Sequence, residues 1–410
     1  MRVGRGLPVL AAAWALAPSV ASAADWSVDR NVELSCGVDD NYGLGVDARR
    51  RADSLSLTGG IGASRATENA VTSLAGQLTD QLLRGDIGQN ELQDKLTLSQ
   101  TLNDPIDHFE MTATLAHDNT LQTPTSSADL LLGRGLRRSS GATAAWTRRL
   151  TERLGASLDA GLARTAYGLS LAGAKNYQSA AIDAGLQYAW DERDNLHLGL
   201  GHSDYRTEDG SARSLGEHLS LGLGRALDET QRATIDLGVY RTRTAAWVDA
   251  QVCPLDISLC QSGVVNYITV QRLGHRNRWG AQFGLSWNAQ FDERTSARVA
   301  VNRQEDPSGA GVTVRSDTVA ASVRRALAPT TDGGLAYTLS RSTYQGLQQG
   351  PQPRLQTLAA TISRQVSPAM TVRAGYQYTR SDEPFTGRSA HSNNASVSLR
   401  YEWPRLEATR

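Results

Sequence analysis

Residues 278–303 read RWGAQFGLSWNAQFDERTSARVAVNR, and this stretch decides the fold class. From Trp279 to Phe291 every second residue is apolar, and the residues between them are Gly, Gln, Ser or Asn. Successive side chains of a β-strand point to opposite faces, so the pattern predicts a long strand with one apolar and one polar face. The run stops at the polar triplet Asp292-Glu293-Arg294, and a second alternating run follows it. Two such runs joined by a tight polar turn predict a β-hairpin.

The same hairpin pattern recurs along the chain. Further turn signals lie at residues 150–153, 191–195, 228–230, 329–332 and 367–369. Most neighbouring signals are roughly 37–40 residues apart, which fits two membrane-crossing strands with one short and one longer connection. The one longer interval, between Asp228 and Asp292, holds an insertion.

The alternating runs predict an all-β fold, a transmembrane antiparallel up-and-down β-barrel of about sixteen strands, within a range of about fourteen to eighteen. A lead-in at residues 31–41 would make a seventeenth strand, but bacterial single-chain barrels have an even number, so we expect sixteen. A soluble propeller is the alternative architecture. It requires four short strands per repeat, whereas these strands are longer and each repeat holds two.

Aromatic residues gather at both ends of the predicted strands. One set, just before turns or the C-terminal tail, is Trp146, Trp190, Phe291 and Trp403; the set at the opposite strand ends is Tyr167, Tyr205, Tyr240, Tyr344 and Tyr378. Two aromatic rings, one at each membrane interface, are typical of outer-membrane barrels. We therefore expect both sets to form interfacial girdles.

Bulk composition agrees with a barrel and excludes other classes of protein. No run of about eighteen apolar residues is present, so no transmembrane helix is expected. Mean hydropathy is −0.38. A membrane barrel shares such a value with soluble proteins, because only alternate residues face lipid. The formal net charge is zero, so we expect no nucleic-acid partner.

Residues 1–23 have the features of a secretory signal peptide. A basic start precedes an apolar run that is too short to span a membrane as a helix, and the small-residue motif Ala21-Ser22-Ala23 ends it. We expect cleavage after Ala23 and one mature domain, the barrel, over residues 24–410. Export of a β-barrel implies location in the bacterial outer membrane.

Two stretches of the predicted barrel depart from simple alternation. Residues 66–90 suggest a loop helix, because apolar residues recur there at helical spacing, at Val71, Leu74, Leu78 and Leu82. Residues 245–277 form the longest insertion, and we expect a long extracellular loop there.

The polar faces of the strands would line an aqueous channel, because a barrel of this size is too wide to be filled by its own side chains. They are rich in Gly, Ser, Thr, Gln and Asn, and they also carry charge. If the alternation holds, the charged residues that line the lumen include Asp159, Asp183, Asp236, Arg298, Arg373, Arg400 and Glu402. They either set selectivity for charged solutes or are solvated without such a role.

Cysteine usage fits an oxidising compartment. Cys253 and Cys260 both lie in the longest insertion, which predicts a local loop disulfide. No histidine or third cysteine lies near them, so we expect no metal site. We expect Cys36, the remaining cysteine, to be a small buried residue.

The sequence lacks the common motifs of catalysis: G-x-S-x-G, H-E-x-x-H and a phosphate-binding loop. His197 and His202 lie near Ser203 and Asp204. A barrel enzyme would need a His–Ser pair at its lipid-facing rim. Polar histidines at a strand end more often have no catalytic role, so we expect no enzyme activity, no catalytic residue and no cofactor.

Past the predicted signal peptide, a strand ends in Gly37-Val38-Asp39-Asp40-Asn41, and a polar stretch leads through Ala52-Asp53-Ser54 into the next strand. With paired hairpins over the rest of the chain, this arrangement resembles the outer-membrane β-barrel porins found with exopolysaccharide loci, including those of PEP-CTERM/exosortase systems. The C-terminus departs from that pattern. Residues 404–410 follow Trp403, where such barrels commonly end in an aromatic residue.

The resemblance implies a passive polar conduit that exports an extracellular polysaccharide, with a periplasmic export partner. The residues themselves imply only a water-filled barrel in contact with outer-membrane lipid. A general or sugar-selective diffusion porin for small hydrophilic solutes is therefore the alternative function. A barrel enzyme acting on outer-membrane lipid is the second alternative.

Overall fold

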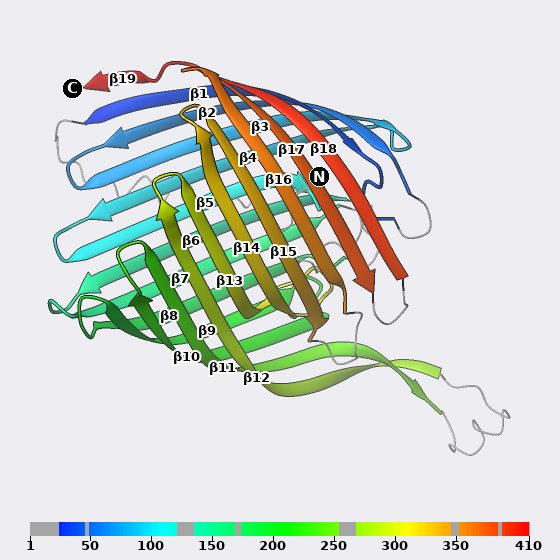
Figure 1. The fold of residues 1–410 in the computed structure, drawn as a ribbon. Coiled ribbons are helices and arrows are strands. Elements are labelled where there is room, and N and C mark those ends of the chain that lie inside the picture. The colour runs from blue at the N-terminus through cyan, green and yellow to red at the C-terminus, as the bar shows by residue number, and fades with distance from the viewer. Residues whose placement is uncertain are drawn as a thin grey trace.

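Over the residues that the structure describes, the chain forms a closed antiparallel barrel of 18 strands with one further short strand at its C-terminal end (Figure 1). This computed structural model describes residues 24–45, 49–120, 135–168, 174–253, 268–345, 352–383 and 388–409. The strands are β1 (Asp25–Asp39), β2 (Ala52–Ala66), β3 (Ala70–Gly85), β4 (Gln89–Asn103), β5 (Asp107–Asn119), β6 (Leu136–Arg149), β7 (Leu154–Tyr167), β8 (Tyr177–Ala189), β9 (Asp194–Thr207), β10 (Ala212–Ala226), β11 (Gln231–Val252), β12 (Ile268–Asp292), β13 (Thr295–Asp306), β14 (Val314–Ala328), β15 (Thr331–Tyr344), β16 (Arg354–Ser367), β17 (Met370–Glu383), β18 (Arg388–Glu402) and β19 (Leu406–Thr409).

The barrel closes between its first and last long strands. β1 pairs with β2 on one side, and residues 31–39 of β1 pair with residues 394–402 of β18 on the other. All other neighbours among β1–β18 are consecutive in sequence, as in an up-and-down meander. Closure removes the unpaired edges that a backbone in lipid cannot tolerate. β19 pairs with residues 25–28, at the start of β1.

The two ends of the barrel differ in the length of their connections (Figure 1). Tight turns close one end, and most of the longer connections lie at the other. Asp191 begins one tight turn, and its Oδ1 atom accepts hydrogen bonds from the backbone N–H groups of Arg193 and Asp194. These bonds lower the pKa of the Asp191 carboxyl. Asp228 and Asp292 make the same backbone contact in their turns, which explains why aspartate marks these positions in the sequence.

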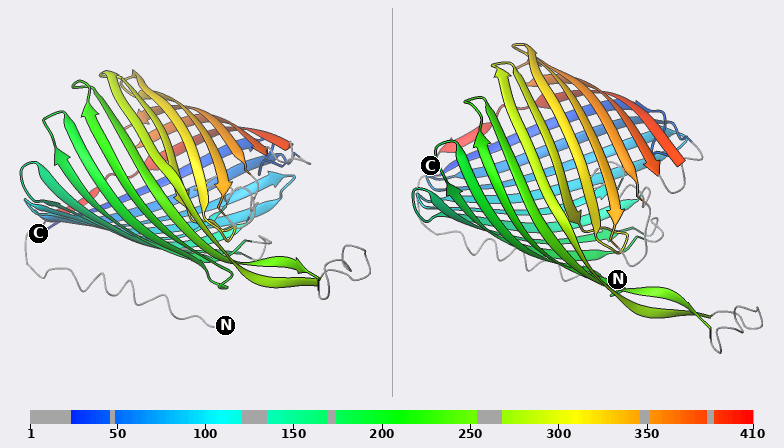
Figure 2. Two further views of the ribbon diagram at one scale, coloured as in Figure 1. Left: turned by 90° about the horizontal axis from the view of Figure 1, so that it is seen from below. Right: turned by 60° about the horizontal axis from the view of Figure 1, so that its bottom comes forward.

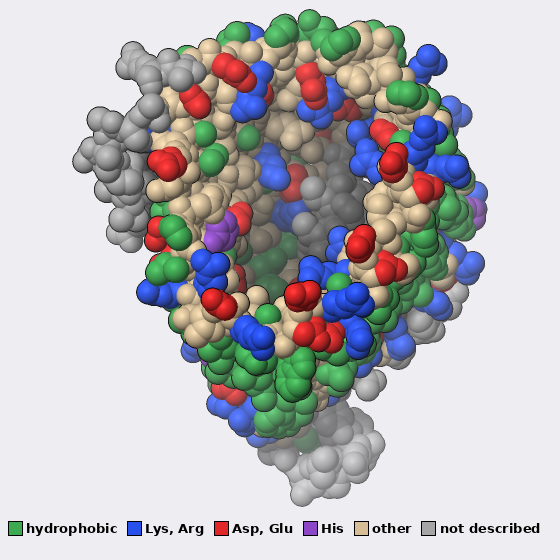
Figure 3. Space-filling view, turned by 60° about the vertical axis from the view of Figure 1, so that its left-hand side comes forward, with side chains coloured by type: hydrophobic (Ala, Val, Ile, Leu, Met, Phe, Trp, Pro, Cys, Tyr) green, Lys and Arg blue, Asp and Glu red, His purple; other side chains and the backbone are tan. Residues whose placement is uncertain are grey.

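Alternation sorts the side chains into an apolar outer face and a polar inner face. On β12, Leu285 is 43% exposed on the outer face, and it pairs with Ile235 of β11, which is 46% exposed. Gln282 and Ser286 point to the opposite face. Large exposed apolar side chains recur in this way on most strands, and Figure 3 shows hydrophobic side chains along the outer wall. An apolar surface of this extent is stable where it meets lipid.

Among the described residues, the structure contains no helix long and apolar enough to cross a bilayer.

Two corrections raise the number of barrel strands from the expected sixteen to 18, the upper end of the expected range. The lead-in at residues 31–41 belongs to a full strand, β1. Residues 66–90 do not contain the expected loop helix, because Ala70–Gly85 is β3 and pairs on both sides. Its leucines are four residues apart, and a strand also places that spacing on one face. Adding both strands keeps the total even.

Residues 245–277 are only partly a loop. β11 and β12 stay paired beyond the barrel wall, as far as Val252 opposite Ile268, so most of the expected loop is a hairpin. Figure 2 shows this hairpin projecting from the barrel. The hairpin lies at the end opposite the tight turns, and its extracellular location stays a prediction.

The expected position of one cysteine is wrong, and two other expectations lie outside the described residues. Cys36 is a free thiol exposed on the outer face of β1, because its even position places it beside Leu34 and Val38. Cys260 is outside the described residues, so its disulfide with Cys253 stays a prediction. The same holds for the signal peptide at residues 1–23.

Candidate functional site

The charged residues expected in the lumen occupy the polar face of their strands. Asp236, for example, lies between Ile235 and Leu237, which are 46% and 62% exposed on the outer face. The same parity places the others on the inner face: Asp159, Asp183, Arg298, Arg373, Arg400 and Glu402. Glu402 forms an ion pair with Arg400, with 2.8 Å between Glu402 Oε1 and Arg400 Nε.

Charges of both signs line the inner face. Asp159 and Asp183 face each other across β7 and β8. Basic side chains follow further along the wall, near the tight-turn ends of their strands, at Arg232, Arg298, Arg324, Arg373 and Arg400. Figure 3 looks into the barrel and shows Lys, Arg, Asp and Glu side chains around a hollow interior. Charged side chains of both signs around the lumen create local electric fields that act on polar solutes.

Two histidine–aspartate pairs lie on the inner face. The two members of each pair come from strands that flank a third strand, and their side chains meet over a glycine of that middle strand. The two sets are Asp183–Gly201–His218 and His197–Gly222–Asp236. His218 Nε2 lies 3.2 Å from Asp183 Oδ1. A Cβ atom on Gly201 or Gly222 would collide with both members of its pair. The glycines therefore let these side chains lie flat against the wall, which leaves the lumen wider.

A separate polar hollow of about 470 Å³ lies near the tight turns, and its lining includes Asp228 and Glu229. Within it, Arg232, Asn288 and Arg298 form one row of facing residues across β11–β13. Neither guanidinium of this row has an ion-pair partner among the described residues. This part of the wall is therefore suited to an anionic group on a solute.

At the loop end, residues 307–313 between β13 and β14 fold inward; we call them the inner segment. The Ser308 carbonyl accepts a 2.7 Å hydrogen bond from Tyr205 Oη of β9. The Gly309 carbonyl accepts one of 2.7 Å from the backbone N–H of Lys175. Since β9 and β13 are separated in the wall by three strands, these bonds draw the inner segment across part of the lumen. Ser308 is fully buried by this packing.

The base of the inner segment is also tied to β11. Glu305 accepts a 2.7 Å hydrogen bond from Thr242 Oγ1 and another from Thr313 Oγ1. Below lies a hollow of about 430 Å³ whose lining includes Tyr240, Gln282 and Pro307. Wall and inner segment together form a narrowed passage at the loop end of the lumen.

The inner segment packs against Tyr167 and Tyr205, two tyrosines that were expected in a membrane girdle. The rings of Tyr167, Tyr177 and Tyr205 follow one another on β7–β9, with centroids 6.5 and 5.3 Å apart. Tyr205 is 2% exposed and Tyr240 is 6% exposed, so neither faces lipid. Their positions have the parity of the inner face, and this signal was readable from the sequence.

The girdle interpretation is thus wrong for most tyrosines and fits the tight-turn aromatics. The inward tyrosines among the expected set are Tyr167, Tyr205, Tyr240 and Tyr344, whereas Tyr378 shares the outer face with Tyr376. At the tight-turn end, Trp190, Phe291 and Trp403 are 62%, 59% and 40% exposed, as an interfacial ring requires.

A closed wall with an apolar outer face and a charged lumen is the form in which chains cross the bacterial outer membrane. The protein is an outer-membrane β-barrel. No protein-family model matches the chain, and no curated protein matches it significantly.

Among solved structures, the barrel is similar to OpdK of Pseudomonas aeruginosa, crystallised with vanillate, at 12% identity and a TM-score of 0.47 over 92% of this chain and 99% of that one. It is similar to OccK9 (OpdG) of the same bacterium at 12% identity and a TM-score of 0.49, over 93% and 98% of the two chains. For OccAB3 of Acinetobacter baumannii the identity is 8% and the TM-score 0.45, over 93% and 99%.

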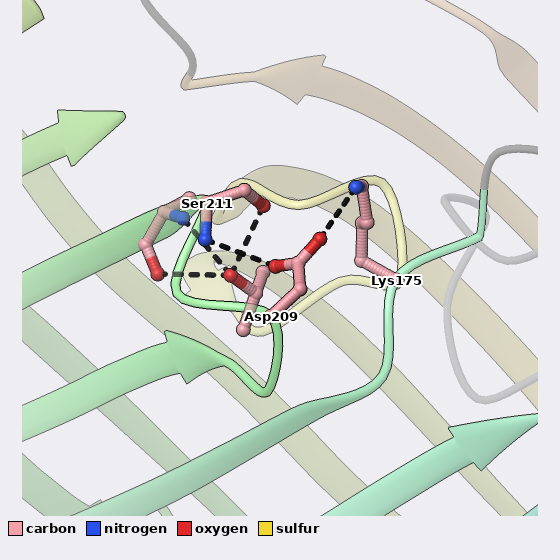
Figure 4. A network of polar contacts seen from close by, with 5 residues as sticks. Lys175, Asp209 and Ser211 are labelled. Atoms are coloured by element: carbon pink, nitrogen blue, oxygen red, sulfur yellow. Dashed lines mark hydrogen bonds and ion pairs between the residues drawn. The ribbon is translucent and has the colours of Figure 1, made fainter. Parts of the chain in front are cut away.

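Lys175, Asp209 and Ser211 form a set of polar contacts, here called the clip, that holds two loops together beside the inner segment (Figure 4). Lys175 Nζ donates a 2.6 Å hydrogen bond to Asp209 Oδ2, and the Ser211 backbone N–H donates to Asp209 Oδ1 at 2.9 Å. Burial alone would raise the pKa of the Asp209 carboxyl, but hydrogen bonds from Lys175, Ser211 and Thr207 lower it well below its ordinary value. The clip joins the β7–β8 connection to the β9–β10 turn.

Neither His197 nor His202 forms a catalytic pair with Ser203. His202 and Ser203 are consecutive on β9, so they point to opposite faces of the wall. His197 faces the lumen and contacts Asp236. Within the described ranges, no cluster of three or more His, Cys, Asp or Glu side chains is arranged to hold a metal ion.

Proposed function

We propose that the protein is a passive diffusion channel for small polar solutes, with its tight turns in the periplasm and its longer loops outside the cell. Both described chain ends lie at the tight-turn end, which supports this orientation. The observation that carries the proposal is the inner segment, since it narrows a lumen that the wall alone would leave wide.

The size of the inner hollows supports small solutes. The hollow under the inner segment measures about 430 Å³, and the one beside the histidine–aspartate pairs about 630 Å³. These volumes lie in the range of about 300–1,000 Å³ that small molecules occupy in proteins. Their walls offer hydroxyl, amide and charged groups, which replace part of the hydration shell of a polar solute.

Export of a polysaccharide, which the family resemblance implies, would require the inner segment to leave the lumen. Its carbonyl groups accept hydrogen bonds from Tyr205 and Lys175, and Glu305 at its base accepts one from Thr242. Breaking these bonds together would expose buried polar groups, so we favour diffusion of small solutes over passage of a polymer.

The test is reconstitution of the purified barrel in liposomes and planar bilayers. Swelling assays with sugars of increasing size should show entry of monosaccharides and exclusion of longer oligosaccharides. Removal of residues 308–311 should raise the single-channel conductance and admit larger sugars. A folded barrel that passes no small solute would contradict the proposal. Loss of secreted polysaccharide on deletion of the gene, with polymer retained in the periplasm, would return the assignment to export.

A further inference from the structure

The outer wall of the barrel carries a hollow of about 490 Å³, here called the outer hollow. Its floor includes the small outward side chains of Ala142 and Ala180, and its sides include Leu96, Leu115 and Leu162. These leucines are 37%, 43% and 66% exposed. A depression among lipid-facing side chains of this kind has the shape and polarity of an acyl-chain site.

A row of hydrogen-bond donors borders the outer hollow at the loop end of the barrel. Arg164, Gln178, Arg206 and Arg213 face one another in register across β7–β10, on the same outer face as the leucines. Adjacent strands are about 4.8 Å apart, so the row places its three guanidinium groups within roughly 15 Å. Arg206 and Arg213 lie next to the loop-side ends of their strands.

The positive charge of this row is only partly balanced. Arg164 Nε donates a 2.5 Å hydrogen bond to Glu208, and Arg213 donates one of 2.7 Å to Asp204. Arg206 has no hydrogen-bond or ion-pair partner among the described side chains, and its cross-strand neighbour is Arg213. Like charges directly opposite each other destabilise a strand pair, so an anion bound between these arginines would relieve the repulsion.

We propose that the outer hollow binds a phosphorylated, multiply acylated glycolipid of the outer leaflet. An acyl chain lies against Leu115 and Leu162, and a phosphate accepts hydrogen bonds from Arg206 and Arg213. Guanidinium groups match phosphate oxygens in bidentate geometry. The proposal rests on the orientation proposed above, since only a barrel with its loops outside the cell brings this row to the level of the glycolipid phosphates.

The test uses the purified full-length barrel in detergent, diphosphorylated lipid A as the probe and native mass spectrometry as the readout. The wild-type barrel should retain lipid A through detergent exchange. The double variant Arg206→Gln/Arg213→Gln should retain it at least about tenfold less, which corresponds to about 1.4 kcal/mol. Ala142→Phe, which fills the outer hollow and leaves the charges intact, should have a similar effect.

The matched control is Arg364→Gln, an outward arginine on the tight-turn side of β16 that does not border the hollow. It should retain lipid A as the wild type does. Equal retention by the double variant and the wild type would overturn the proposal, as would equal retention of dephosphorylated lipid A or of phosphatidylglycerol. Heat-modifiable gel mobility shows whether each variant is folded. Conductance should be unchanged in all variants, so a barrel without conductance would contradict only the proposed channel function.

Discussion

At the scale of single residues, the parity of a position decides what its side chain meets. Most outward positions away from the strand ends are apolar because they face lipid, and inward positions hold polar, charged and small residues. Gly201 and Gly222 are inward glycines with a specific use, because each leaves room for a histidine and an aspartate from the two flanking strands. The width of the lumen therefore depends on residues that carry no side chain.

Replacement of Gly201 by valine should narrow the lumen. The new side chain occupies the space of His218 and Asp183 and forces both to stand away from the wall. Single-channel conductance should fall while the barrel remains folded. Gly59→Val is the control, because nothing lies within 4 Å of a Cβ at Gly59. An unchanged conductance in Gly201→Val would contradict the wall-lying geometry.

Introduction of arginine should distinguish the two faces of β12. Leu285→Arg places a charge in the apolar belt and should cost about 2–4 kcal/mol near the midplane of the bilayer. Gln282→Arg places the same charge in the lumen and should cost far less. Urea unfolding in lipid vesicles measures both. Equal costs would mean that this strand does not separate lipid from water.

At the scale of strands, alternation was sufficient to predict most of the wall, and it failed where two periodicities coincide. Leu74, Leu78 and Leu82 satisfy both a helix and a strand, and only their pairing partners on β2 and β4 decide between the two. The inner segment had no such signal at all. Its contact with Tyr205 joins positions that are 103 residues apart, and the sequence carries no periodic trace of it.

Removal of one hydroxyl should loosen the inner segment. Tyr205→Phe deletes the donor to the Ser308 carbonyl and leaves that buried acceptor without its partner. The expected loss is about 1–3 kcal/mol, seen as larger current fluctuations in planar bilayers. Tyr337→Phe, on the outer face, is the matched control and should behave as the wild type does. Quiet currents in both variants would show that this bond does not hold the inner segment.

The clip at Asp209 should respond to acid with a defined sign. The pKa of this carboxyl is lowered in the folded protein. Its contribution to the stability of the folded turn is therefore complete above the unfolded pKa of about 3.9 and is lost as pH falls through the folded pKa. The free energy that opens the β9–β10 turn should therefore be lower in Asp209→Asn than in the wild type by a constant amount between about pH 5 and 8. This difference should shrink below about pH 4. Hydrogen exchange of the β9–β10 turn measures it. A difference that grows in acid would contradict the clip.

At the scale of the whole molecule, the barrel closes where β1 pairs with β18, a junction here called the seam. β1 pairs with β2 along residues 25–39 but with β18 only along residues 31–39, and β19 covers the start of β1 that β18 does not reach. Deletion of residues 404–410 should therefore lower the temperature at which the barrel loses its compact mobility in gels. A deletion variant with the mobility and melting temperature of the wild type would show that β19 does not support the seam.

The seam also determines the order in which strand pairs form during folding. Every other junction of the wall joins neighbouring strands of one hairpin meander, and it can form as soon as those strands are present. The seam joins Asn31 to Glu402, so it cannot form until nearly the whole chain has crossed the inner membrane. Contacts between such distant positions form slowly, because the ends of a long loop must meet first. Until then the lipid-facing leucines have no membrane to face, and the unclosed chain must be protected from aggregation in the periplasm.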